Sequence, residues 1–126
     1  REEDQLQIDC KLWFDKNYPG KQMLFFKIHN EGWKPMKQAR IDKAMGLRAG
    51  VYDMFLSIPA AGYHGCYFEF KSLKGGLSKN QKKFKAKAEK MGYKCVGPVR
   101  DKEVFITEVQ EYLIKDNGDY CIALCI

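Results

Sequence analysis

The stretch GCYFEFK, residues 65–71, is the strongest fold signal in the chain. Its apolar and polar side chains alternate with the two-residue repeat of a β-strand. One face would present Cys66, Phe68 and Phe70, and the other Tyr67, Glu69 and Lys71. An acid and a base about 7 Å apart on one face of a hydrophobic strand are costly unless that face meets solvent or forms a site. The stretch therefore predicts a strand with either an exposed ion pair or a reactive site on one face.

A second acid lies in the strand predicted just before this one. Residues 51–58 are mostly apolar, but Asp53 lies near the start of this run. Aspartate is unfavourable inside a strand. The connection PAAGYHG, residues 59–65, is rich in turn formers and predicts a hairpin-like loop. If the two strands are neighbours, the carboxylates of Asp53 and Glu69 converge beside Lys71 and suit a divalent metal ion. The alternative is that Asp53 only caps a turn.

A helix is predicted after this strand, over residues 78–92. Ser78 and Gln81 have the spacing of a capping box, in which each side chain bonds to the backbone of the other residue. Gln81 therefore has a structural role besides any catalytic one. The apolar stripe of this helix consists of Phe84, Ala88 and Met91.

The rest of the chain predicts further helices and strands around this centre. Apolar periodicity and turn formers place helices at 2–18, 35–45 and 101–114, and strands at 23–29, 93–96 and 120–126. The order α-β-α-β-β-α-β-α-β is typical of a layered α/β domain. A length of 126 residues supports one domain, and we expect it to span residues 1–126.

The positive charge of the chain is concentrated next to the predicted site. The whole chain has a net charge of +6, with 22 basic and 16 acidic residues. Nine of the basic residues but only one acid fall between Lys71 and Lys94, so this segment carries +8 and the remainder −2. Such a segment is either a solvated helix face or a surface that contacts phosphates. Its position beside two candidate metal-binding acids favours the second interpretation.

Composition excludes several other classes of protein. Apolar residues make up 45% and aromatic residues 13%, which excludes a disordered or collagen-like chain. No apolar run approaches the roughly 20 residues of a membrane span, and the polar residues 1–7 do not fit a signal peptide. The five cysteines form no C-x-x-C pair, so we expect Cys10, Cys66 and Cys95 to be reduced core thiols. These features predict an intracellular domain with an anionic partner.

Taken in order, these motifs resemble the VRR-NUC domain, which belongs to the PD-(D/E)xK nuclease superfamily. The matching runs are GLRAGVYDMFL at 46–56, EFK at 69–71 and GLSKNQ at 76–81, and the resemblance covers residues 3–113. It implies an α/β fold with a restriction-endonuclease-like core, a central mixed β-sheet flanked by helices. One position departs from the family pattern, because Tyr52 stands where the family usually has proline. This departure removes loop rigidity but no metal ligand.

The resemblance also implies a role for each matched polar residue. The implied catalytic residues are Asp53, Glu69, Lys71 and Gln81, with the lysine orienting the attacking water. The implied ligands of one or two Mg²⁺ or Mn²⁺ ions are Glu3, Asp53, Glu69 and the backbone carbonyl of Phe70. Glu2 or Asp4 takes the place of Glu3 if the alignment is off by one residue.

The function expected from this resemblance is metal-dependent endonucleolytic cleavage of DNA, selective for branched or Holliday-junction-like structures. The expected DNA contacts are Asn30, Arg48, Lys74, Lys79, Lys82 and Lys83. The size of the chain resembles stand-alone phage and bacterial members, so we expect a homodimer in a bacterial cytoplasm, encoded by the host, a phage or a prophage. The apolar residues 120–126 are a candidate subunit contact.

Two other functions stay open at the level of sequence. A non-catalytic nucleic-acid-binding domain would use the lysine-rich helix 78–92, and Asp53 and Glu69 would then be dispensable. A third interpretation makes the lysines a solubility surface and predicts no salt-sensitive DNA binding.

Overall fold

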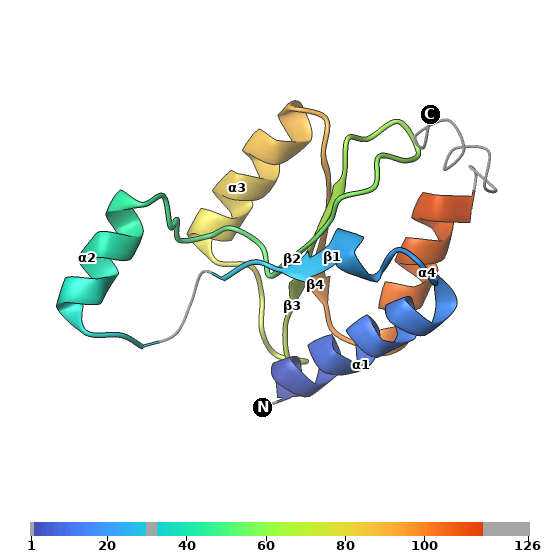
Figure 1. Ribbon diagram of the computed structural model, residues 1–126, viewed down its shortest axis with the longest axis horizontal. Coiled ribbons are helices and arrows are strands. Elements are labelled where there is room, and N and C mark those ends of the chain that lie inside the picture. The colour runs from blue at the N-terminus through green and yellow to red at the C-terminus, as the bar shows by residue number, and fades with distance from the viewer. Residues whose placement is uncertain (1, 30–32, 115–126) are drawn as a thin grey trace.

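The computed structural model describes residues 2–29 and 33–114 (Figure 1). The described elements follow the predicted order, and the strand predicted at 120–126 lies outside them. The helices are α1 (Glu2–Asn17), α2 (Met36–Ala44), α3 (Lys79–Lys90) and α4 (Lys102–Ile114). The strands are β1 (Phe25–Lys27), β2 (Met54–Leu56), β3 (Cys66–Phe70) and β4 (Lys94–Val99), and a short 3-10 helix, η1 (Gln22–Leu24), precedes β1. None of the described helices is long and apolar enough to cross a membrane.

The strands form one mixed sheet in the order β1-β2-β3-β4. β2 pairs antiparallel with both β1 and β3, whereas β3 and β4 are parallel. The predicted hairpin-like connection is confirmed, because residues 59–65 lie in the segment 57–65 that joins β2 to β3 and contain a bridge between Ala60 and Tyr63. A parallel pair requires a crossover, which α3 supplies between β3 and β4. The predicted fold class is therefore confirmed.

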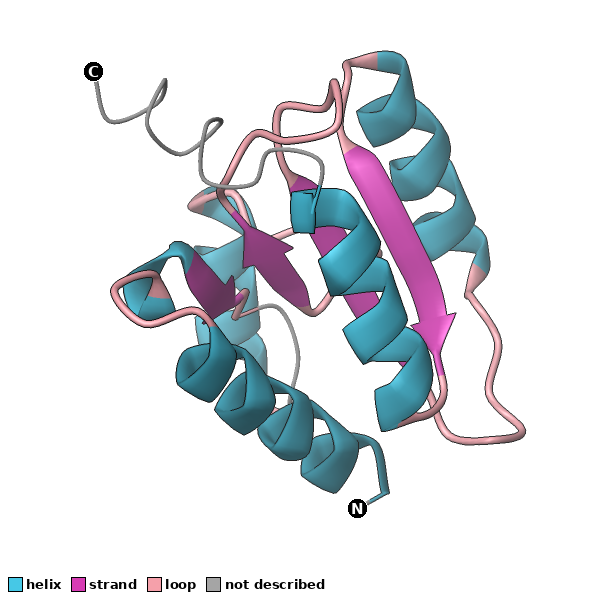
Figure 2. Ribbon diagram, turned by 90° about the vertical axis from the view of Figure 1, so that its right-hand side faces the viewer, coloured by secondary structure: helices cyan, strands magenta, loops and turns pink. Residues whose placement is uncertain are grey.

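Helices cover both faces of this sheet (Figure 2). On one face, the Phe105 ring of α4 lies 5.1 Å from the ring of Phe68 and 5.7 Å from that of Phe25. On the other face, α3 packs its apolar side chains against Tyr67 and Cys95. The alternation predicted for β3 is confirmed, since Cys66, Phe68 and Phe70 belong to the first layer and Tyr67 to the second.

Several element ends differ from the prediction. The strand predicted at 23–29 shortens to β1 because residues 22–24 form η1, and the strand predicted at 51–58 shortens to β2. β4 instead runs three residues past its predicted end, because Val99 still pairs with Phe70 beyond a break in register. Met91 does not join the apolar stripe of α3 and is 68% exposed, because it occupies the C-cap of the helix.

The three cysteines predicted to be reduced core thiols are free and buried, which confirms that prediction. Burial raises the pKa of the Cys10 and Cys95 thiols to about 12, because a thiolate would lose its hydration there. Burial also raises the pKa of Cys66. Neutral buried thiols of this kind are chemically inert. Cys121 and Cys125 lie outside the described residues.

Candidate active site

The antiparallel pairing of β2 and β3 places Asp53 beside the end of β3. Met54 pairs with Phe68, so the residue before Met54 lies opposite the residues after Phe68. The backbone N–H of Asp53 donates to Glu69 Oε1 at 3.1 Å, and the N–H of Phe70 donates to Asp53 Oδ2 at 2.8 Å. The two strands are therefore neighbours, as the convergence of the two acids required. A backbone N–H group of the neighbouring strand holds each carboxylate.

Gln81 connects the first turn of α3 to the same carboxylate. Its Nε2 donates to Glu69 Oε2 at 2.8 Å, while its Oε1 accepts from the Ser78 N–H at 2.8 Å. The Ser78 hydroxyl accepts from the Gln81 N–H at 3.1 Å, which completes the predicted capping box. One amide therefore both caps the helix and holds Glu69, because its oxygen and its nitrogen point to different partners.

Lys71 provides the positive charge next to these acids. Its Nζ lies 3.3 Å from Glu69 Oε2, with 19% of the lysine side chain and 3% of the glutamate side chain exposed. The alternative of an ion pair on a solvent-exposed face is therefore wrong for Glu69. α3 covers this face and keeps water from the Glu69 carboxylate, so protein groups must compensate its charge. These groups are the lysine, the Gln81 amide and the Asp53 N–H.

A bulge in β4 makes room for Glu69. Phe68 pairs with Val96 and Phe70 with Val99, so β4 has one extra residue opposite Glu69. A Cβ placed on Gly97, within this bulge, would lie 2.9 Å from the Cβ of Glu69. Glycine is required there because the backbone of β4 approaches the buried glutamate closely. The sequence analysis missed this residue, although a Gly-Pro pair inside a strand is a signal for a bulge.

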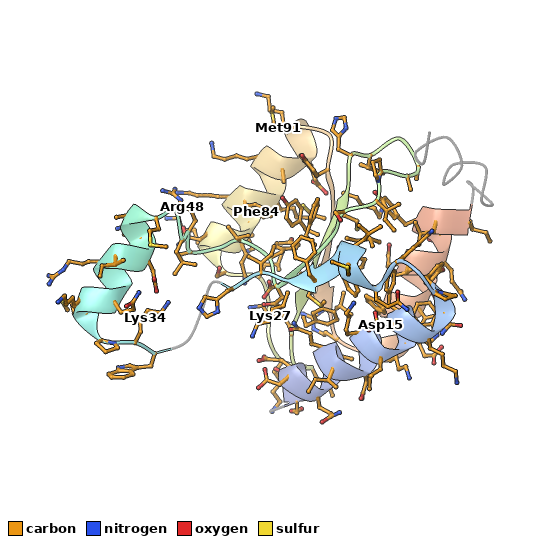
Figure 3. The ribbon with its side chains drawn as sticks, in the orientation of Figure 1. Asp15, Lys27, Lys34, Arg48, Phe84 and Met91 are labelled. Carbon is orange, nitrogen blue, oxygen red and sulfur yellow. The ribbon has the colours of Figure 1, made fainter. Side chains whose placement is uncertain are left out.

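Tyr52, the position that departs from the family pattern, lies fully buried between the sheet and α3. Its ring lies 5.6 Å from that of Phe84, which Figure 3 shows on α3. Its hydroxyl is the one buried side-chain polar atom among the described residues that has no hydrogen-bond partner. Burial raises the pKa of Tyr52, and the nearby Glu69 carboxylate adds to the increase. This tyrosine thus fills space on the α3 face at the cost of an unsatisfied hydroxyl.

Replacing Tyr52 by phenylalanine is expected to raise the free energy of unfolding by about 1 kcal/mol, because it removes a buried unsatisfied hydroxyl. The matched control is Tyr112→Phe, since the Tyr112 hydroxyl donates to the Ile58 carbonyl at 2.7 Å in the core. That change should lower the free energy of unfolding by about 1 kcal/mol or more. Urea unfolding of both variants measures the two signs, and a loss of stability in both would contradict the assignment.

The donor set at the site fits a hard divalent cation. Within residues 2–29 and 33–114, no three side chains of His, Cys, Asp or Glu gather into a metal-binding group. Asp53 and Glu69 nevertheless provide a pair of carboxylates, and Phe70, whose carbonyl is the third candidate ligand, directly follows Glu69 and donates its N–H to Asp53. Mg²⁺ is commonly held by one or two carboxylates, with water and substrate phosphates as its other ligands. Two carboxylates are therefore enough for this metal.

The other predicted residues that the structure describes lie on α1, on α3 and in the segments before β2 and after β3. Glu3, at the start of α1, accepts from the Ser72 N–H at 3.2 Å, in the loop that follows β3. Its role as a metal ligand stays a prediction. Four lysines and one arginine predicted to contact DNA are exposed, namely Arg48, Lys74, Lys79, Lys82 and Lys83. Asn30 lies outside the described residues.

Comparisons with known proteins bear on the fold. Neither a family model nor a curated protein matches the sequence. Among solved structures, a protein described as "VRR_NUC domain protein" aligns with a TM-score of 0.74 and 23% sequence identity. The alignment covers 90% of this chain and 88% of that chain. The chain therefore has the fold of a VRR-NUC domain, as its motifs implied.

Proposed function

We propose that this protein is a metal-dependent endonuclease that hydrolyses DNA phosphodiester bonds where β2 begins and β3 ends. The observation that carries the proposal is the buried Glu69 carboxylate, which contacts Asp53, Lys71 and Gln81 from three different segments of the chain. A buried charge is weak evidence for stability, and convergent titratable groups are typical of functional sites. The fold shared with a VRR_NUC domain protein supports the same function.

Each residue has a distinct role in this proposal. Asp53 and Glu69, with the Phe70 carbonyl, would hold Mg²⁺ or Mn²⁺, which when bound neutralises the phosphate and lowers the pKa of water. Lys71, beside Glu69, orients the attacking water and stabilises negative charge on the phosphate. Gln81 is a positioning residue, because its amide fixes the Glu69 carboxylate. Glu3 is proposed as a further ligand on the side of α1.

The lysines of α3 extend the proposed site into a DNA-binding surface. Lys82 and Lys83 follow Gln81 directly and are exposed, so phosphates of bound DNA can reach them. We propose branched, junction-like DNA as the substrate and a homodimer as the assembly, because two sites are needed to cut two strands of one junction. The motif resemblance supports both of these points.

Cleavage is expected to depend on a divalent cation. Labelled linear duplex and four-way-junction DNA would be incubated with the protein in Mg²⁺, Mn²⁺ or EDTA at equal ionic strength. We expect cuts in Mg²⁺ or Mn²⁺, none in EDTA, and faster cutting of the junction. Binding without cleavage in every condition would instead support a nucleic-acid-binding domain. An absence of salt-sensitive binding would leave the lysines as a solubility surface.

A further inference from the structure

A positively charged hollow lies where the end of α2 meets the start of α3. It has a volume of about 420 Å³ and is lined by Lys43, Leu47, Arg48, Ala49 and Asn80. Figure 3 shows Arg48 between the two helices. The polar side chains of this α2–α3 hollow are two cations and one amide, and no carboxylate of the described residues lines it. Such a lining suits an anion with several acceptor oxygens.

The two cations are not neutralised by neighbouring acids. Neither Lys43 nor Arg48 forms an ion pair or side-chain hydrogen bond with any of residues 2–29 or 33–114. The acid next to Lys43 in the sequence, Asp42, already accepts hydrogen bonds from Lys34 and Gln38. These bonds lower the pKa of Asp42, so its carboxylate stays ionised and paired with Lys34. The positive charge of the hollow is therefore available to a ligand.

Close packing fixes the wall of the hollow that carries Arg48. Gly50 has a φ of +93°, and a Cβ placed there would lie 2.6 Å from the backbone carbon of Asn80. At the other end of the segment, the Leu47 N–H donates to the Asp42 carbonyl at 2.9 Å. Arg48 is thus held between an anchor on α2 and an anchor on α3, so its backbone position is defined before any ligand binds.

Both walls of the hollow are followed in the chain by residues of the candidate active site. Asn80 directly precedes Gln81, whose amide holds Glu69. Gly50 precedes Asp53 by three residues, which span at most about 11 Å. Successive phosphates of one DNA strand advance about 3.4 Å along the helix axis. A phosphate in the hollow would therefore lie a few nucleotides from a phosphate at Asp53 and Glu69.

We infer that the α2–α3 hollow binds a backbone phosphate of DNA a few nucleotides from the scissile phosphate. The inference rests on the proposed function, because it requires DNA at the site, and it identifies residues that set the position of the strand. The Arg48 guanidinium can donate to two phosphate oxygens, while Lys43 contributes a compact charge and Asn80 an amide donor. Contacts of this kind fix the register of DNA without reading its sequence.

The test compares two double variants that each remove two positive charges. The first, Lys43→Gln with Arg48→Gln, empties the α2–α3 hollow of cations. The control, Lys16→Gln with Lys102→Gln, changes a second hollow of about 430 Å³ that lies between α1 and α4. Binding of labelled DNA is measured in EDTA over a range of salt concentrations. We expect the first variant to bind about tenfold more weakly and to lose about 0.9 from its log–log salt slope, and the control to change little.

A neutral phosphate analogue then locates the contact. Single methylphosphonates are placed at each position within several nucleotides of the cut. In the unmodified protein, analogues at the positions that contact basic residues should weaken binding. At one of these positions, a few nucleotides from the cut, the loss should disappear in the Lys43→Gln, Arg48→Gln variant but persist in the control. The inference would be overturned if the two double variants had the same DNA affinity and salt slope. It would also be overturned if every methylphosphonate weakened binding equally in both variants.

The outcomes for the hollow and for the proposed function remain distinguishable. If the hollow variant behaves like its control but the protein still cuts DNA with Mg²⁺, only the inference about the hollow fails. If the unmodified protein neither cuts DNA nor binds it in a salt-sensitive manner, both the proposed function and the inference fail. Thermal unfolding of both double variants checks that the exposed substitutions leave the fold intact.

Discussion

Replacing Glu69 by glutamine is expected to lower metal-dependent DNA cleavage by roughly 10³-fold or more. The carboxylate is the shared partner of Asp53, Lys71 and Gln81. In the proposed function, its charge both holds the metal and places the lysine. Glutamine has nearly the same shape, and we therefore expect the variant to fold. The measurement is the initial rate of cleavage at saturating Mg²⁺, together with the urea unfolding curve of the same sample.

The matched control for this prediction is Glu89→Gln on α3. Glu89 is exposed and pairs only with Lys85 among the described residues, at 3.0 Å and one helical turn away. An exposed pair of this kind contributes little to stability, so the control should cut DNA at the normal rate. Cleavage by the folded Glu69→Gln variant at a rate close to that of the control would refute the role of Glu69.

Replacing Gly50 by alanine is expected to lower the free energy of unfolding by roughly 3 kcal/mol. Two costs add at this position. The positive φ of +93° is unfavourable for any residue with a Cβ, and the new Cβ would lie 2.6 Å from both the backbone carbon and the Cβ of Asn80. Since the obstacle is partly backbone, it cannot be relieved by rotating a side chain. Urea unfolding at neutral pH gives the change in free energy.

Gly46→Ala separates the two costs, because Gly46 has a similar φ of +109° but a Cβ there would meet no atom within 4 Å among the described residues. It should lose roughly 1–2 kcal/mol, which is the conformational cost alone. The difference between the two variants then measures the contact between Gly50 and α3. Equal losses in both would mean that residues 47–50 do not pack against Asn80 as described.

Much of the fold could be predicted from the sequence because its signals are local. The alternation at 65–71 follows from the two-residue repeat of a strand, and the capping box at Ser78 and Gln81 from the spacing of one helical turn. The turn formers at 59–65 made an antiparallel hairpin the natural connection, and this pairing brought Asp53 to Glu69. The acids of the candidate site could therefore be identified without knowledge of the tertiary structure.

The remaining features depend on contacts between segments that are far apart in the chain. Glu69 is buried because α3 packs on the sheet. The bulge at Gly97 provides the space that its side chain occupies. The two functions of the Gln81 amide follow from the same packing. Spacing alone placed Gln81 at the helix start, but it did not show that the amide nitrogen would face a carboxylate on β3.

The sequence by itself thus determined the order of the elements, the alternation of β3 and the acids that meet at the hairpin. Covalent geometry and backbone hydrogen bonding act over a few residues, so these features do not require knowledge of the packing. Only the tertiary structure decided how deeply Glu69 is buried and which cations face the α2–α3 hollow. Those properties depend on how closely whole helices approach the sheet and one another, and that distance is set by the combined shape of many side chains.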